Sequence, residues 1–198
     1  MTRIKGDEPA AWDAIAASLP RDGGTSLPEL KLLHDLASRV RHNCIVEIGS
    51  FVGRSTIALA KGSIAGHGVA VYAVEPHEHV RSAMGVEFSP RDREDFLQNL
   101  LRAQVTDVVR PVGLSSLTVA RAWELPIAML FIDGDHHYDA VRADVDAWAP
   151  HVISGGVILF HDAFNEKLGI ERVVGEVLDG DGYEKHLEVG TVCAIRKR

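Results

Sequence analysis

The stretch NCIVEIGSFVGRSTIALA, residues 43–60, contains a short apolar run, two glycines and a helical pattern, in that order. The run 43–49 is rich in β-branched residues and predicts a strand that is buried on both faces, as in a parallel sheet. Gly49 and Gly53 allow the backbone to turn sharply after this strand. The pattern from about 53 to 63 predicts a helix, and a strand that leads through such a turn into a helix is typical of α/β proteins.

The same alternation continues along the chain. Four more short apolar runs predict buried strands at residues 69–75, 107–113, 127–133 and 156–162. Further helical patterns lie before, between and after the strands, at about residues 27–41, 90–104, 115–123, 138–148 and 166–179. Alternation of this kind predicts a doubly wound α/β fold with a mostly parallel sheet.

The C-terminal part departs from this alternation. YEKHLEVG (183–190) and TVCAIRK (191–197) both have the pattern of strands, with only a turn at Gly190 between them. Two strands joined so tightly are expected to form an antiparallel hairpin. We therefore expect a single domain over residues 27–198, preceded by an N-terminal segment of residues 1–26.

The composition is that of an ordinary globular protein, with 46% hydrophobic and 25% charged residues. A net charge of -7 argues against a protein that mainly binds nucleic acid, because phosphate backbones attract basic surfaces. No apolar run approaches the roughly 20 residues of a membrane span, and the N-terminus is a poor signal peptide. We therefore expect a cytoplasmic protein without nucleic acid or membrane partners, in which Cys44 and Cys193 are buried, reduced thiols.

The residues at the carboxyl ends of the strands are candidates for a site, because ligands of doubly wound sheets bind there. The first strand is followed by Gly49 and Gly53, and the second strand ends in Glu75. Glycines let backbone N–H groups approach a ligand, and a carboxylate at the second strand end can accept hydrogen bonds from both hydroxyls of a ribose. The pattern predicts a nucleoside-containing cofactor; the alternative is a tight turn beside a solvated Glu75.

The glycine-rich loop differs from the dinucleotide-binding motif Gly-x-Gly-x-x-Gly, because Phe51 occupies the position of the middle glycine. EIGSFVGRST (47–56), with the spacing Glu-x-Gly-x-Phe-x-Gly, instead resembles the first motif of class I S-adenosylmethionine-dependent methyltransferases, and especially that of small O-methyltransferases. The resemblance extends over about residues 30–198. The C-terminal hairpin agrees with it, since the seven-stranded sheet of this family ends with one antiparallel strand.

The resemblance implies that S-adenosylmethionine is the cofactor. In this family the loop after the first strand faces the amino-acid end of the cofactor, and the acid at the second strand end holds its ribose. The cofactor-binding residues implied in this sequence are Glu47, Gly49, Ser50, Phe51, Gly53, Ser55, Glu75, Ser115 and Asp133. Ser115 follows the third strand, where relatives approach the adenine; its alternative role is to cap the next helix.

Ionisable residues crowd into LFIDGDHHYDAVRADVDAW (130–148) at the end of the fourth strand, and His161 and Asp162 end the fifth. A calcium loop is excluded, because DGDHHYDAVRAD (133–144) lacks the glycine at its sixth position and the terminal glutamate. An HD-type phosphohydrolase is disfavoured, since such enzymes are helical and this His-Asp pair ends an apolar strand. The Asp-Gly-x-His sequence resembles the cation-dependent O-methyltransferases that act on sugars and other hydroxylated natural products.

That resemblance implies a divalent cation, Mg²⁺ or Mn²⁺, with Asp133, His161 and Asp162 as ligands. His161 stands where relatives can carry Glu, which favours Mn²⁺ or another transition ion, or leaves no metal at all. A hydroxyl attacks a sulfonium methyl well only after losing its proton, for which a metal and a nearby histidine are suited. His136 is the candidate base and, with Asp133, the implied catalytic pair; the alternative for His136 is a structural hydrogen bond.

These features together predict an O-methyltransferase whose partner is a small hydroxylated molecule, with a homo-oligomer as one option for its assembly. The long irregular stretch 76–90 suggests a substrate lid or a mobile surface loop. Two alternatives remain open: an NAD(P)-dependent oxidoreductase, and a non-catalytic cofactor-binding module that acts through a partner.

Overall fold

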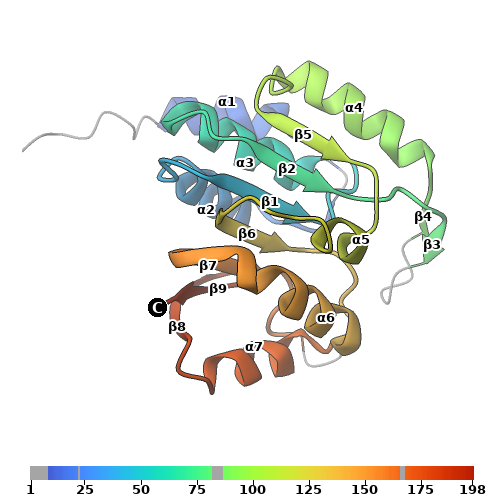
Figure 1. Ribbon diagram of the computed structural model, residues 1–198. Helices are drawn as coiled ribbons and strands as arrows, with labels where there is room; N and C mark the ends of the chain where they lie inside the picture. Colours follow the sequence, from blue (N-terminus) through green and yellow to red (C-terminus); the bar gives the residue numbers. More distant parts are fainter. Residues whose placement is uncertain (1–8, 22, 82–86, 166–167) are drawn as a thin grey trace, which may run out of the picture.

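The computed structural model describes residues 9–21, 23–81, 87–165 and 168–198, and a seven-stranded sheet forms its centre (Figure 1). The strand order is β5-β2-β1-β6-β7-β9-β8, in which β9 alone runs opposite to the other six strands. The strands are β1 (Cys44–Ile48), β2 (Val71–Val74), β5 (Val109–Val112), β6 (Ile127–Ile132), β7 (Val152–Phe160), β8 (Tyr183–Val189) and β9 (Val192–Lys197). The predicted mostly parallel sheet with a C-terminal hairpin is confirmed.

Helices cover both faces of this sheet (Figure 1). One layer contains α2 (Leu27–Ala37), α3 (Arg54–Gly66) and α4 (Arg91–Ala103), and the other contains α5 (Ser116–Ala120), α6 (Tyr138–Trp148) and α7 (Ile170–Leu178). Successive strand residues such as Ile45 and Val46 belong to two separate apolar clusters, because side chains alternate between the faces of a strand. Burial on both faces explains why the strands are continuous apolar runs in the sequence.

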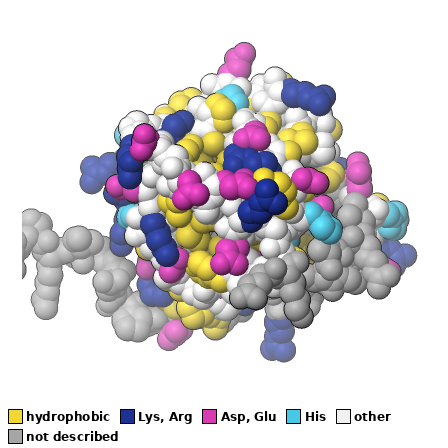
Figure 2. Space-filling view, turned by 90° about the horizontal axis from the view of Figure 1, so that it is seen from below, with side chains coloured by type: hydrophobic (Ala, Val, Ile, Leu, Met, Phe, Trp, Pro, Cys, Tyr) yellow, Lys and Arg dark blue, Asp and Glu magenta, His cyan; other side chains and the backbone are white. Residues whose placement is uncertain are grey.

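The outward faces of α6 and α7 are polar. Arg142 and Asp146 form an ion pair at 2.6 Å on α6, and Arg172 and Glu176 form another at 2.9 Å on α7. Figure 2 shows acidic and basic side chains interspersed on this side of the molecule. The mixed signs on the face shown give no continuous basic surface for a nucleic acid backbone.

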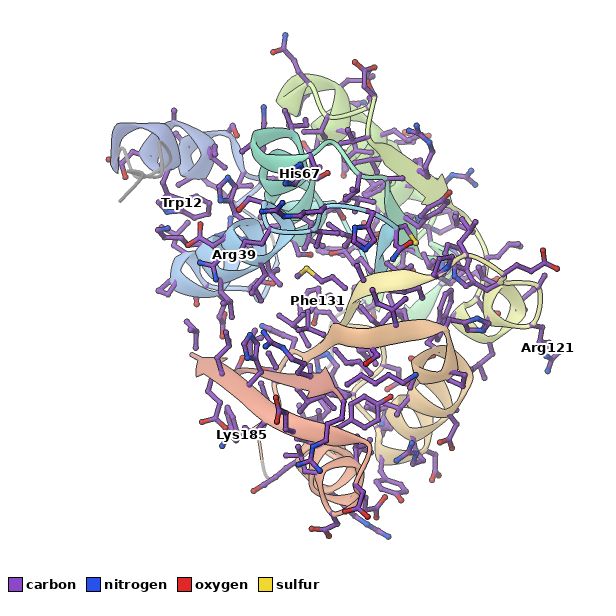
Figure 3. All side chains as sticks on the ribbon, turned by 60° about the vertical axis from the view of Figure 1, so that its left-hand side comes forward. Trp12, Arg39, His67, Arg121, Phe131 and Lys185 are labelled. Atoms are coloured by element: carbon purple, nitrogen blue, oxygen red, sulfur yellow. The ribbon has the colours of Figure 1, made fainter. Side chains whose placement is uncertain are left out.

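An additional helix, α1 (Pro9–Ser18), lies in the N-terminal segment, where the sequence pattern had predicted no element. Its alanine-rich stretch favours a helix. Trp12 lies beside α2 (Figure 3), where its ring meets that of His34 at a centroid distance of 5.5 Å. Lys31 places its ammonium 5.9 Å from the Trp12 ring, so contacts with α2 hold α1 in place.

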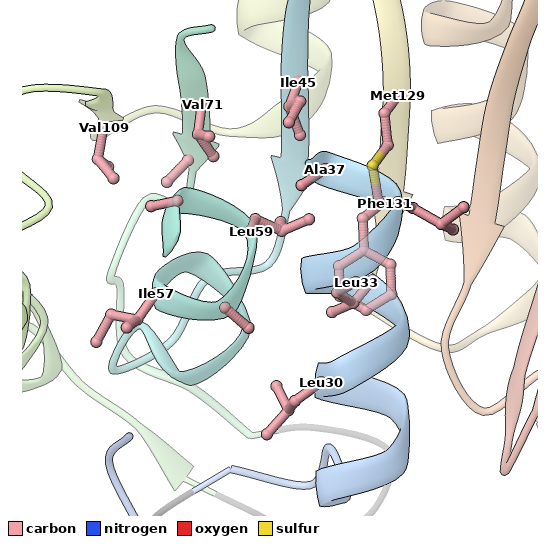
Figure 4. Packing of buried hydrophobic residues seen from close by; sticks show 14 of the residues in the cluster. Leu30, Leu33, Ala37, Ile45, Ile57, Leu59, Val71, Val109, Met129 and Phe131 are labelled. Atoms are coloured by element: carbon pink, nitrogen blue, oxygen red, sulfur yellow. The ribbon is translucent and has the colours of Figure 1, made fainter. Parts of the chain in front are cut away.

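The cluster between the sheet and the first helix layer holds the strands in register. Leu33 of α2 and Leu59 of α3 pack in one cluster with Ile45 of β1 and Phe131 of β6 (Figure 4). Leu33, Leu59, Ile45 and Phe131 are fully buried. This packing fixes β1 against β6, and the loops that follow these strands therefore begin at one edge of the sheet.

Two elements differ from the sequence prediction in extent. β7 begins at Val152, before the predicted start at residue 156, because Gly155 and Gly156 interrupt the apolar pattern. Gly155 has φ +77°, and the register against β6 shifts in this part of the strand. The helix predicted at 115–123 is the short α5, because residues after Ala120 turn toward β6.

The irregular stretch 76–90 contains a two-stranded antiparallel hairpin formed by β3 (Val80–Arg81) and β4 (Glu87–Phe88). Residues 82–86 lie outside the described residues, so the expectation of a substrate lid remains a prediction.

Cys44 and Cys193 are buried free thiols, as predicted. Among the helices that the structure describes, none is both long and apolar enough to cross a membrane.

Candidate functional site

Four strand ends meet at one edge of the sheet. Beyond the strands, the N–H groups of Gly49, Asp133 and His161 still donate to carbonyls of the neighbouring strand, at 3.0, 2.9 and 3.1 Å. Glu75 N–H donates in the same way to Val112 O at 3.0 Å. The loops after β1, β2, β6 and β7 therefore start side by side, and they carry most of the site residues predicted from the sequence.

The loop after β1 requires its glycines. Gly49 and Gly53 have φ values of +87° and +90°, in the left-handed region that favours glycine. A Cβ atom at Gly49 would collide with the backbone of Asp133, and a Cβ at Gly53 would lie 3.0 Å from the Phe96 ring. Phe51 also has a positive φ, +43°, so the chain bends back on itself between β1 and α3.

Glu47 lies at the base of this loop and is completely buried. Burial raises the pKa of its carboxyl to about 8, and the negative charges of Asp133 and Glu75 add to this effect. Hydrogen bonds from Ser55 and Thr56 oppose it. Ser55, which the sequence predicted as a cofactor-binding residue, therefore interacts with the Glu47 carboxyl group.

Two buried polar atoms beside the loop lack hydrogen-bond partners in the described part of the chain: Glu47 Oε1 and Ser50 Oγ. Buried polar atoms are almost always paired in folded proteins, with protein, water or a ligand. These two atoms are suited to receive a small polar ligand.

The predicted ribose acid, Glu75, is half-buried and accepts a hydrogen bond from the His77 N–H at 3.1 Å. Ser115 follows β5 and is exposed. Its hydroxyl pairs with Thr118 Oγ1 at 2.7 Å and does not cap the backbone of α5. The capping alternative for Ser115 is therefore not supported, whereas its predicted role near the adenine is still a prediction.

Acidic and imidazole side chains form a cluster at the ends of β6 and β7. Asp133 Oδ1 lies 3.4 Å from His136 Nε2 and 3.0 Å from His161 Nδ1. Asp162 Oδ2 lies 3.3 Å from His136 Nδ1 and 3.6 Å from His161 Nδ1. The structure thus brings together all four residues that the sequence had proposed as base or metal ligands.

The charges in this cluster compensate one another. Burial lowers the pKa of His136, but Asp133 and Asp162 outweigh burial and raise it to about 9. Asp133 and Asp162 likewise overcome burial at His161 and raise its pKa to about 8. In turn, the pKa of Asp162 is lowered, chiefly by hydrogen bonding to His136. The two carboxylates therefore lie beside imidazolium groups at neutral pH.

The donor set also fits a divalent metal ion. One ligand atom from each of Asp133, His136 and His161 lies within 4.8 Å of the others. Among the described residues, His136 Nε2 and both ring nitrogens of His161 are buried 3.0 to 3.7 Å from carboxylate oxygens of Asp133 or Glu29, but none of them makes a well-aligned hydrogen bond. The sequence had placed Asp162, not His136, in the ligand trio; the geometry makes both residues available.

Glu29 is a site residue that the sequence analysis missed. This carboxylate from α2 is 3% exposed, and its Oε2 lies 3.7 Å from His161 Nε2. Oε2 also accepts hydrogen bonds from the Ser26 N–H and hydroxyl at 2.7 Å each. Ser26-x-x-Glu29 has the sequence of a helix capping box, and this local role conceals the contact with the cluster.

Comparison with known proteins gives one family. A family model described as "Methyltransferase domain" matches residues 46–163. A catechol O-methyltransferase from Mycobacterium tuberculosis is 32% identical over 164 residues, which are 80% of this chain and 66% of that protein. A second curated relative, the protein y4gI of Sinorhizobium fredii, is 29% identical over 136 residues, 64% of this chain and 14% of its own length. The chain therefore spans less than two thirds of the length of these curated relatives.

Solved structures show the same fold. Cofactor-bound Rv0187 from MTB has a TM-score of 0.69 and 24% identity, and the match covers 98% of this chain and 92% of that one. The O-methyltransferase TomG from Streptomyces achromogenes, in complex with SAM, has a TM-score of 0.67 and 20% identity, with 96% and 91% covered.

Proposed function

Since the chain belongs to the methyltransferase-domain family, as its sequence motif suggested, we propose that it is an S-adenosylmethionine-dependent enzyme that methylates a hydroxyl oxygen of a small molecule. The observation that carries the proposal is Glu47. This fully buried carboxyl group lies one residue before the end of β1, beside a loop of positive-φ residues, and one of its oxygens has no hydrogen-bond partner in the described residues.

The loop after β1 is suited to the amino-acid end of the cofactor. S-adenosylmethionine carries an α-ammonium group there, which can donate to Glu47 Oε1 and favour the ionised carboxylate. Ser50 Oγ supplies a second polar atom, and Gly49 and Gly53 leave room for close approach of the ligand. Glu75, at the end of β2, is placed to accept hydrogen bonds from the ribose hydroxyls. TomG, solved with SAM bound, has the same fold.

The acid–imidazole cluster is the proposed place of methyl transfer. We propose His136 as the base: Asp162 Oδ2 lies 3.3 Å from its Nδ1, and Asp133 Oδ1 lies 3.4 Å from its Nε2 on the other side of the ring. The pairing with Asp162 orients the ring. Because Asp133 and Asp162 keep the ring protonated in the free protein, a cation bound to these carboxylates would lower the pKa of His136, and Nε2 could then take a proton from the acceptor hydroxyl. Asp133, between the loop after β1 and the cluster, borders both the cofactor and the acceptor.

The same cluster can hold a divalent ion through Asp133, His161 and Asp162, a set of ligands that leaves His136 to act as the base. Two imidazoles beside carboxylates suit Mn²⁺ or another transition ion better than Mg²⁺, which prefers oxygen ligands. When bound, such an ion would act as a Lewis acid that lowers the pKa of the acceptor hydroxyl.

The acceptor is proposed to be a small hydroxylated compound such as a phenol or a sugar. The M. tuberculosis relative is named a catechol O-methyltransferase, and this supports a phenolic acceptor. Exposed apolar side chains flank the cluster in sequence: Leu27 precedes Glu29 and is 47% exposed, and Phe164 follows Asp162 and is 43% exposed. Such side chains suit the carbon skeleton of an acceptor.

Titration calorimetry with S-adenosylmethionine, its demethylated product S-adenosylhomocysteine and NAD tests the cofactor. We expect both sulfur compounds to bind and NAD not to bind; tight binding of NAD alone would identify an oxidoreductase instead. A panel of catechols, other phenols and sugars then tests catalysis by mass increase of the acceptor. Cofactor binding without transfer to any compound of the panel would favour a non-catalytic binding module.

A further inference from the structure

The loop between β1 and α3 has an unusual backbone. Positive φ values recur at Gly49, Phe51 and Gly53, and Phe51 is not a glycine. A side chain in the left-handed region raises the energy of the backbone, so the surrounding contacts must hold this conformation in place. The described contacts of the loop show which side chains do so.

Two side chains from separate elements bind consecutive carbonyls of this loop. His77, which follows β2, has its Nε2 2.9 Å from Phe51 O. Asn99, on α4, donates from Nδ2 to Val52 O at 3.0 Å. Neither contact is local, because His77 and Asn99 are far from the loop in sequence.

The contact made by His77 determines its tautomer. A carbonyl oxygen only accepts hydrogen bonds, so the ring nitrogen Nε2 must carry the proton that is shared with Phe51 O. Nδ1 is then an acceptor, and it is buried without a partner within the described ranges. His77 is 7% exposed, so water does not replace the carbonyl as a partner at Nε2 without local opening.

His77 also touches the other half of the proposed cofactor site. Its backbone N–H donates to Glu75 Oε1 at 3.1 Å, and its own φ is +52°. Its ring packs against Phe96 at a centroid distance of 5.5 Å, and a Cβ atom at Gly53 would lie only 3.0 Å from the same Phe96 ring. One residue therefore connects the glycine-rich loop with the acid at the end of β2.

We propose that His77 is a positioning residue for the cofactor, assisted by Asn99. The side chains of His77 and Asn99 hold the carbonyls of Phe51 and Val52. Because the C=O and N–H of a trans peptide point in opposite directions, the same two contacts fix the directions of the N–H groups of Val52 and Gly53. The loop is thereby preorganised at a fixed distance from Glu75 before the cofactor arrives. This inference rests on the proposed function, since it assumes that a nucleoside cofactor lies between the loop and Glu75.

The test compares three variants in binding S-adenosylhomocysteine, measured by titration calorimetry on the full chain. His77→Leu removes the donor, and its dissociation constant should rise roughly 10- to 100-fold, as expected when a buried acceptor loses its partner. His77→Gln retains an N–H at a similar reach, and its affinity should stay within about threefold of the wild type. His67→Leu, an exposed histidine at the far end of α3, is the matched control and should bind normally.

A structural role alone predicts a different outcome. His77→Leu would then lower the melting temperature but bind S-adenosylhomocysteine with wild-type affinity well below that temperature, and this result would overturn the inference. If His77→Leu does not fold, Asn99→Leu tests the contact with the adjacent carbonyl. Weakened binding of S-adenosylhomocysteine by this variant supports the positioning role of the two side chains, and normal binding contradicts it. Failure of the wild type to bind S-adenosylhomocysteine and S-adenosylmethionine would instead refute the proposed function, and the inference with it.

Discussion

Glu29 Oε2 lies 3.7 Å from His161 Nε2, so the first turn of α2 reaches the end of β7. The other carboxylate oxygen of Glu29 accepts hydrogen bonds from the Thr191 N–H at 2.6 Å and hydroxyl at 2.9 Å. Thr191 Oγ1 in turn accepts the Asp162 N–H at 3.3 Å. A single buried carboxylate thus ties the start of α2 and the turn before β9 to the two residues that follow β7.

Replacing Glu29 by Gln should destabilise the protein. The amide keeps the shape but replaces one of the two acceptor oxygens by an NH2 donor, so that either the Ser26 N–H or the Thr191 N–H loses its acceptor. We expect a loss of about 2–3 kcal/mol in the free energy of unfolding, measured by urea denaturation. Glu171→Gln, on the exposed first turn of α7, is the control and should change little. Equal stability of the two variants would show that Glu29 is not a structural tie.

A second prediction concerns Glu47 and pH. Its folded-state pKa of about 8 lies above that of an unfolded chain, so folding favours the protonated form. Stability from this group is fully present below about pH 4.5 and is lost as the pH rises toward 8. Glu47→Gln should therefore match the wild type near pH 5 and exceed it by roughly 3–5 kcal/mol above pH 8, without cofactor.

Glu47→Gln should at the same time bind S-adenosylmethionine more weakly, because it lacks the charge that would pair with the α-ammonium group. A variant that is more stable but binds less well is typical of a residue kept for function. Urea denaturation at both pH values and calorimetry measure the two effects. A variant with wild-type affinity would remove Glu47 from the cofactor site.

The sequence could predict the sheet and the first part of the site because both depend on local patterns. Apolar runs located the strands, and the glycine spacing in 47–53 located the loop. It could not predict Glu29 or His77, because their contacts depend on tertiary closure: Glu29 meets Thr191 across 162 residues of chain. It assigned Asp162, and not His136, as a metal ligand from the resemblance alone, because the distances between these side chains depend on the loops after β6 and β7.

The acid at the end of β2 gives a third prediction. Glu75→Ala should lose a charge-assisted hydrogen bond to the ribose and weaken S-adenosylhomocysteine binding by roughly 1.5–3 kcal/mol in calorimetry. Glu78→Ala removes an equal charge from an exposed position three residues later and serves as the control. Equal affinities would mean that Glu75 does not hold the ribose.

A fourth prediction separates the base from its neighbours. His136→Ala should slow methyl transfer about 10²–10⁴-fold and leave cofactor affinity nearly unchanged, as expected for loss of a general base. His137→Ala is the matched control, because His137 is exposed and its ring pairs with Asp135 at 2.6 Å. Single-turnover rates with an accepted phenol or sugar measure the effect. An unchanged rate for His136→Ala would exclude it as the base.

The last prediction is the metal. Asp133 Oδ1 is within 3.4 Å of imidazole nitrogens on both His136 and His161, so its removal should disrupt the donor set more than loss of any outer residue. We expect a chelator to abolish turnover, Mn²⁺ to restore it, and Asp133→Ala to prevent the rescue. Electron paramagnetic resonance of Mn²⁺ bound to the enzyme without acceptor separates loss of the ion from loss of catalysis.

The role of His161 is tested in the same way. His161→Ala should weaken Mn²⁺ binding if this ring is a ligand, whereas Asp135→Ala, which removes an exposed acid from the loop after β6, should not. Full activity in excess chelator, together with no Mn²⁺ binding, would contradict the metal proposal; charge pairing of the imidazolium rings of His136 and His161 with Asp133 and Asp162 would then account for the acidic cluster.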